Sequence, residues 1–174
     1  LPSDRALEVE VLTTLRLTHP GIVRALDHGI DREGRDVAIF DDPGRPLVRW
    51  LAERGPAPAG LAGRHTLELA AALEHAHGAG VQHGGVDASC VWVDRAERVR
   101  LSGFGRVGAA ACDQRGLALL FVTLVTGQVD GTPGLDRFEG PVAAALRRAL
   151  SGAPSERFAT CLDLALALIG VECA

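Results

Sequence analysis

Two short stretches decide the fold: Gly80-Val-Gln-His-Gly-Gly-Val-Asp-Ala-Ser-Cys-Val-Trp-Val-Asp94 and, eight residues later, Ser102-Gly-Phe-Gly105. The apolar run at 91–93 predicts a short strand, and the polar residues 94–98 predict a turn. Residues 99–101 then predict a second strand, which ends at a glycine-rich break. Residues 64–80 have helical periodicity. The expected order is therefore a helix, a loop that contains a histidine, a β-hairpin and a Gly-Phe-Gly segment.

This order resembles the catalytic core of a protein kinase, whose signatures are H-R-D-x-K-x-x-N and D-F-G. An alignment on His83 places Gly85 at the catalytic Asp, Asp87 at the Lys and Cys90 at the metal-binding Asn. Gly103 stands at the metal-binding Asp of D-F-G. Because every proton-accepting or metal-binding group of these motifs is replaced, the chain resembles a pseudokinase.

The loss of these groups removes the means of phosphoryl transfer, which depends on positioning and on charge neutralisation by carboxylate-held magnesium. Kinases also hold the nucleotide phosphates with a lysine on their third strand. All 18 basic residues of this chain are arginines, so none can supply that lysine. The resemblance therefore implies a protein that is not an enzyme and that needs no cofactor and no metal.

The resemblance extends over residues 8–168 and implies an α+β fold that is predominantly helical. We expect a single domain, 1–174, with a remnant N-lobe at 1–40 and a C-lobe at 41–174. Periodicity and end signals predict helices at 4–17, 46–54, 64–79, 113–125, 141–150 and 159–169, and strands at 22–29 and 36–40. The glycine-rich roof strands of a kinase have no counterpart. Only seven residues, 106–112, stand where a kinase has its activation segment and A-P-E motif.

Five residues match positions that support the kinase framework. His83 and Phe104 are expected to pack inward, and Asp113 matches the aspartate that grips the backbone next to His83. The simpler interpretation of Asp113 is a helix N-cap, which is compatible with that role. Glu10 matches the glutamate that pairs the missing lysine, so we expect it to face solvent or to pair with an arginine. Arg157 has lost its A-P-E partner and must find another anion or reach solvent.

A vestigial nucleotide pocket is predicted between the second strand and the hairpin. Ile39 matches the gatekeeper, and Phe40 begins the hinge that would face an adenine. Trp92 stands where kinases have a smaller residue beneath the adenine. Its indole would either fill the space of the base or only complete the core, and both alternatives stay open.

Composition excludes several classes of partner. The chain has 47% hydrophobic residues and a net charge of −4, so we expect a compact domain without affinity for nucleic acid. It contains no run that would insert into a membrane. Cysteines 90, 112, 161 and 173 lack metal-ligand spacing and are expected to be reduced and buried in a cytoplasmic protein. His75 and His77 lie two residues apart on a predicted helix, so they are expected to be surface residues. The lack of Lys, Tyr and Met suggests a GC-rich bacterial gene and a trimmed domain.

Three functions are compatible with these residues. The first is an inactive kinase-like module that acts as a protein-interaction scaffold or allosteric regulator, with another protein or another domain of its parent polypeptide as partner. The alternative is a sensor that binds a nucleotide or small ligand without magnesium. The third is an enzyme of another class that uses Cys90 as nucleophile and His83 as base, with Asp87 nearby.

Overall fold

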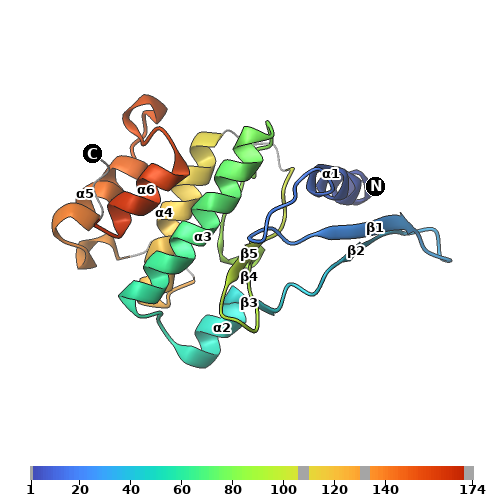
Figure 1. The fold of residues 1–174 in the computed structure, drawn as a ribbon, viewed down its shortest axis with the longest axis horizontal. Coiled ribbons are helices and arrows are strands. Elements are labelled where there is room, and N and C mark those ends of the chain that lie inside the picture. The colour runs from blue at the N-terminus through green and yellow to red at the C-terminus, as the bar shows by residue number, and fades with distance from the viewer. Residues whose placement is uncertain (1, 106–109, 130–133, 171–174) are drawn as a thin grey trace.

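The computed structural model describes residues 2–105, 110–129 and 134–170 and shows an α+β fold that is predominantly helical. Helices α3 to α6 gather at one end, and α1 lies beside the β1–β2 hairpin at the other (Figure 1). The elements are α1 (Pro2–Thr14), β1 (Ala25–Ile30), β2 (Asp36–Phe40), β3 (Arg45–Pro46), α2 (Leu47–Arg54), α3 (Ala59–Gly78), β4 (Val91–Val93), β5 (Val99–Leu101), α4 (Ala110–Thr126), α5 (Gly140–Ala149) and α6 (Cys161–Leu168). The predicted fold class is confirmed.

Most predicted elements occur within a few residues of their expected bounds, with two differences. Helix α3 begins at Ala59, five residues before its predicted start, and Pro58 stands at its N-cap. Strand β3 was not predicted, and its two residues pair with β4. Among the described helices, none is long and apolar enough to cross a bilayer.

The core forms where α3 packs against α4 and α6. The predicted apolar face of α3, with Leu69, Leu73 and Ala76, is fully buried. Helix α4 is buried on several sides, because Leu117, Val122 and Leu124 also have no exposed surface. The nearly continuous apolar sequence of α4 thus reflects its central place in the helical end.

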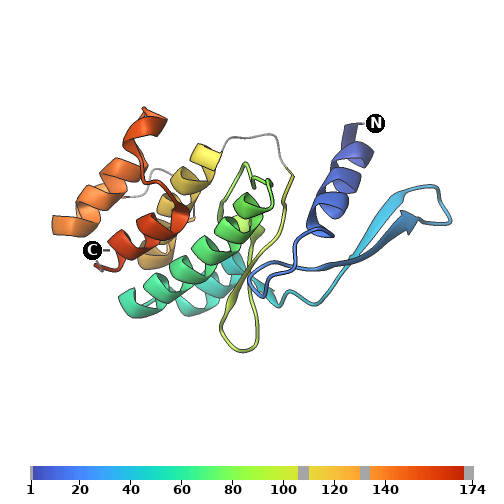
Figure 2. The same cartoon turned by 45° about the horizontal axis from the view of Figure 1, so that its top comes forward.

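A three-stranded sheet of order β3-β4-β5 joins the two ends of the molecule. The chain after α1 runs beside β5, where Ile22 and Leu101 form a parallel bridge. Leu101 donates its N–H to Gly21 O at 2.8 Å, and Val23 donates to Leu101 O at 2.9 Å. Beyond this junction α1 and the two-stranded β1–β2 sheet project away from the helices (Figure 2).

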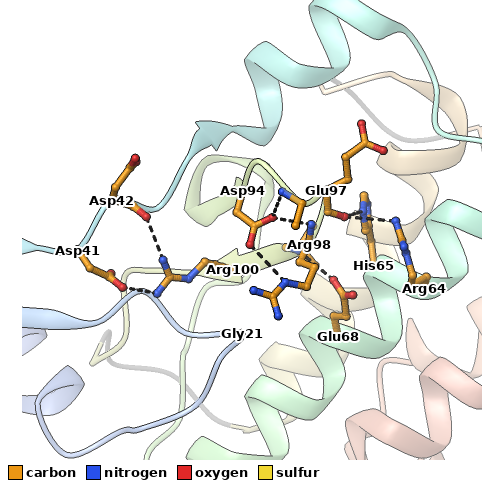
Figure 3. Close-up of polar contacts among 12 residues, drawn as sticks. Gly21, Asp41, Asp42, Arg64, His65, Glu68, Asp94, Glu97, Arg98 and Arg100 are labelled. Atoms are coloured by element: carbon orange, nitrogen blue, oxygen red, sulfur yellow. Dashed lines mark hydrogen bonds and ion pairs between the residues drawn. The ribbon is translucent and has the colours of Figure 1, made fainter.

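Arg100 on β5 secures the segment that follows β2 (Figure 3). Its guanidinium donates to the Asp41 carboxylate at 2.6 Å and to the carbonyls of Asp42 and Ile22, each at 3.1 Å. Since the guanidinium side chain is only 14% exposed, these bonds are shielded from water. One arginine therefore fixes both chain segments that connect the N-terminal end to the sheet.

The turn between β4 and β5 docks on α3 (Figure 3). His65 Nε2 lies 3.0 Å from Glu97 O, and Glu68 accepts the backbone N–H of Val99 at 2.9 Å. Burial lowers the pKa of His65, so the neutral ring is favoured and donates to the carbonyl. These bonds hold the hairpin against the helical end.

Gly116 lets α4 approach the loop that follows α3. A Cβ atom at Gly116 would lie 2.7 Å from the Val86 Cβ, closer than two carbon atoms can stand. We predict that Gly116→Ala lowers the free energy of unfolding by about 1–3 kcal/mol, because the added methyl overfills the contact. Urea denaturation measures this change.

Gly60→Ala is the matched control, because Gly60 lies in α3 and a Cβ atom added there would meet no heavy atom within 4 Å. This variant is expected to gain up to about 1 kcal/mol from better helix propensity. Equal changes at the two glycines would contradict the proposed close approach.

Candidate functional site

The loop at 83–90 is held at its start by a buried carboxylate. Asp113 on α4 is fully buried and accepts the backbone N–H groups of His83 at 3.0 Å and Gly84 at 2.8 Å. The N-cap interpretation of Asp113 is wrong, because α4 already begins at Ala110. Asp113 therefore acts across space on the loop rather than on the end of its own helix.

The His83 ring is fully buried between the loop and β5. Its Nε2 lies 2.8 Å from Ser102 O, and its ring meets Phe104 edge-on with centroids 4.8 Å apart. A ring nitrogen that bonds a carbonyl must carry the proton. Because Nε2 is a donor here, it cannot accept a proton from Cys90. The hypothesis of an enzyme with Cys90 as nucleophile therefore cannot use this nitrogen of His83 as the base.

Asp87 and Cys90 shape the second half of the loop. Asp87 begins a 3₁₀ turn, Ala88–Cys90, and its carboxylate accepts the N–H of Ser89 at 2.7 Å. Cys90 is only 3% exposed, and its Sγ lies 3.0 Å from the carbonyl oxygen of Asp87. Asp87 and Cys90, predicted at the kinase Lys and Asn positions, therefore take part in the local turn.

Gly103, which we predicted to stand at the kinase metal-binding Asp, is tied to helix α1 through its backbone. It has φ of 86° and donates its N–H to Glu10 Oε1 at 3.1 Å. We predicted that Glu10 faces solvent or pairs with an arginine; it is half-buried, and this backbone contact was not expected. Gly85 and Gly103 offer only backbone atoms to the site, while Glu10 positions the second of them.

The three residues of the predicted pocket differ in exposure. Ile39 is 54% exposed, whereas Phe40 and Trp92 are half-buried. The indole N–H of Trp92 donates to Ser102 Oγ at 2.9 Å, which anchors the ring beside Gly103. Trp92 thus has a fixed polar partner, and both of its predicted roles remain predictions.

Arg157 lies in the turn between α5 and α6. Its Nε and Nη2 donate to the carbonyl oxygen of Ser151 at 3.0 and 2.8 Å. The guanidinium therefore closes the 151–157 turn by bonding a backbone oxygen, a type of partner that the sequence did not predict.

The prediction that His77 is a surface residue is wrong. Its side chain is 19% exposed, and its Nε2 lies 2.8 Å from Asp113 Oδ2. This hydrogen bond raises the pKa of His77, and burial only partly opposes it. His75, in contrast, is exposed and stacks on His19, as a surface residue can.

Cys161 and Glu74 lie beside His77. Cys161 is 1% exposed and donates its backbone N–H to Glu74 Oε1 at 2.7 Å. Burial and the nearby Glu74 and Asp113 carboxylates raise the pKa of its thiol. The spacing of Glu74 and His77, three residues apart on one helix, is the sequence signal that could have revealed this group.

We predict that Asp113→Ala lowers the free energy of unfolding by about 2–5 kcal/mol, because it leaves two buried N–H groups without their acceptor. Asp113→Asn should lose less, since one oxygen remains to accept a hydrogen bond. Urea denaturation followed by circular dichroism measures both changes. Asp136→Ala, at an exposed aspartate, should change stability by no more than about 0.5 kcal/mol. A similar small change at Asp113 would show that the carboxylate does not hold the loop.

Part of the chain is similar to known protein kinases. It is 30% identical over 101 residues to mitogen-activated protein kinase kinase kinase 3 of Arabidopsis thaliana, a match that covers 58% of this chain and 16% of that protein. It is 31% identical over 102 residues to eIF-2-alpha kinase GCN2 of Mus musculus, with 56% of this chain and 6% of that protein covered.

A third kinase, mitogen-activated protein kinase kinase kinase ANP1 of Arabidopsis thaliana, is 28% identical over 99 residues, which cover 57% of this chain and 15% of that protein. No protein-family model matches the chain. The chain thus spans a small share of each of these relatives. Together with the α+β architecture, the similarity indicates a kinase-like fold.

Proposed function

We propose that this chain is a catalytically inactive kinase-like module that binds another protein or another domain of its parent polypeptide. One observation carries the proposal. The loop and the Gly-Phe-Gly segment are held by Asp113 and Glu10, yet Gly85 and Gly103 bring no carboxylate to the positions where the resemblance expects the base and a metal ligand. A kinase-like framework that is retained without its catalytic groups is suited to binding another protein.

The remaining polar residues of the loop do not replace the missing groups. Cys90 is buried and offers sulfur, whereas magnesium prefers oxygen ligands, and Asp87 uses its carboxylate Oδ1 to cap the 3₁₀ turn. His83 donates to a carbonyl through Nε2. With no lysine in the chain, the nucleotide phosphates would also lack their usual cation. These features support a loss of phosphoryl transfer.

Helix α1 offers an apolar surface for a partner. Val9 and Leu12 on the helix, and Leu15 just after its end, follow one another at steps of three residues and are 41%, 49% and 49% exposed. Residues on another face of the same helix, Val11 and Thr14, are buried against the rest of the chain. An exposed apolar stripe on a helix that is already packed on its other side commonly marks an interface.

The β1–β2 hairpin adds a second apolar surface. Val37 and Ile39 point to the same side of β2, because side chains alternate along a strand, and they are 39% and 54% exposed. Leu26 and Ile30 on β1 are 48% and 71% exposed. The sheet has two strands, so its outer edges are unpaired within the described chain. A partner could cover these side chains and extend the sheet.

We predict that the purified chain gives no calorimetric heat with ATP, with or without magnesium, at concentrations up to about 1 mM. The physical reason is the absence of carboxylates and lysine for the phosphates and their metal. Micromolar binding without magnesium would instead favour a nucleotide sensor, and loss of that heat in Ile39→Glu would locate the binding at the predicted nucleotide pocket. Magnesium-dependent binding would contradict an inactive module.

The binding surface predicts a pattern among three charge variants. Leu12→Glu and Ile39→Glu should each reduce capture of a partner by at least about tenfold, because a buried unpaired carboxylate is costly in an interface. Leu162→Glu, at a 39% exposed leucine on α6, is the matched control and should leave capture unchanged. Quantitative pull-down from the source cells measures all three, after urea denaturation has shown equal stability. Equal capture by all three variants would exclude α1 and the hairpin as the interface.

A further inference from the structure

We propose that Glu74 and His77 on α3, together with Cys161 at the start of α6, form a binding site for Zn²⁺. Each residue offers one ligand atom, and these three atoms all lie within 4.8 Å of one another. The site lies apart from the surfaces that we assign to protein binding.

Local structure brings the three residues together. Glu74 and His77 are three residues apart, so they share one face of α3. Thr160 caps α6 by accepting the N–H of Asp163 at 2.9 Å, which fixes where that helix begins. Cys161 is its first residue and donates its backbone N–H to Glu74 Oε1. The packing of α6 on α3 therefore places the thiol beside the two α3 side chains.

The ligand types select the metal. A thiolate sulfur, an imidazole nitrogen and a carboxylate oxygen suit Zn²⁺, whereas Mg²⁺ and Ca²⁺ prefer oxygen ligands alone. Zinc bonds of about 2.0–2.3 Å in a tetrahedron place the ligand atoms about 3.3–3.8 Å apart. Side-chain movements of about 1 Å would thus close the present group around an ion. Water can fill the fourth position, because the His77 side chain is 19% exposed.

Asp113 orients the proposed histidine ligand. Zinc-binding histidines almost always donate their other ring N–H to a carboxylate or carbonyl, which fixes the ring and its tautomer. His77 Nε2 already lies 2.8 Å from Asp113 Oδ2, so Nδ1 is the ring nitrogen that remains available to bind a metal. Asp113 is itself fixed by the backbone of His83 and Gly84. The group therefore contains three ligands and the residue that positions one of them.

Binding exchanges a proton for the metal. Zn²⁺ forms a bond to Cys161 Sγ while the thiol proton leaves to solvent, and it accepts lone pairs from His77 Nδ1 and Glu74. The Glu74 Oε2 atom takes no part in the bond to the Cys161 backbone, so it can bind the ion while that hydrogen bond persists. The ion would link α3 to the start of α6 through coordinate bonds.

The test uses the reduced chain after treatment with a chelator, titrated with Zn²⁺ against a chromophoric competitor and with Co²⁺ by absorption spectroscopy. We expect one equivalent of metal, a cobalt–thiolate charge-transfer band and a higher midpoint of thermal unfolding with Zn²⁺. His77→Gln and Cys161→Ala should each weaken Zn²⁺ binding by at least about tenfold. His75→Gln and Cys112→Ser remove exposed residues of the same types and should bind as the parent does.

These variants are chosen to remain folded. The glutamine amide can still donate to Asp113, and alanine keeps a small apolar side chain at the buried position 161; circular dichroism checks both. The proposal is overturned if the parent chain binds no Zn²⁺, if the Co²⁺ complex lacks the thiolate band, or if folded Cys161→Ala binds Zn²⁺ as tightly as the parent.

Discussion

The carboxylate of Asp113 is the constraint on which the rest of the structure depends. It is fully buried, where a charge is tolerated only with hydrogen-bond partners, and the backbone of His83 and Gly84 and the ring of His77 supply them. These partners come from the loop and from α3, whereas Asp113 itself belongs to α4. A single group on α4 thereby joins the end of α3 and the loop that follows it, which lie 29 to 36 residues earlier in the chain.

Further hydrogen bonds connect the loop held by Asp113, through the β4–β5 hairpin, to the N-terminal end of the molecule. Ser102 accepts from the Trp92 indole through Oγ and from His83 through its carbonyl. The next residue, Gly103, donates to Glu10 on α1. Hydrogen bonds to backbone groups thus hold the loop, the hairpin and α1 together.

Elements with strong periodicity could be predicted from the sequence, and contacts between distant residues could not. The helical periodicity of residues 64–80 predicted α3, but Ala59 and Gly60 carry no periodic signal, so the start of α3 was missed. His77 was wrongly predicted to be a surface residue, because helical spacing gives information only about neighbours on the same helix. Its partner, Asp113, lies 36 residues away.

The same limit applies to Glu10. Its match to a kinase position identified the residue but not its new partner, because the bond to Gly103 spans 93 residues and uses a backbone group without any sequence signature. Glu74, His77 and Cys161 likewise come together only through helix packing. Sequence reasoning was accurate where local pattern decides structure and failed where tertiary contact decides it.

The bond between Glu10 and Gly103, and the bridge between Ile22 and Leu101, have a consequence for biosynthesis. A ribosome releases α1 and the first hairpin well before residues 99–103, to which they attach. Contacts of such long sequence separation form late, because a large loop must close first. The first 40 residues of the chain must therefore wait with their apolar side chains uncovered, and in that interval they are most open to chaperones and to aggregation.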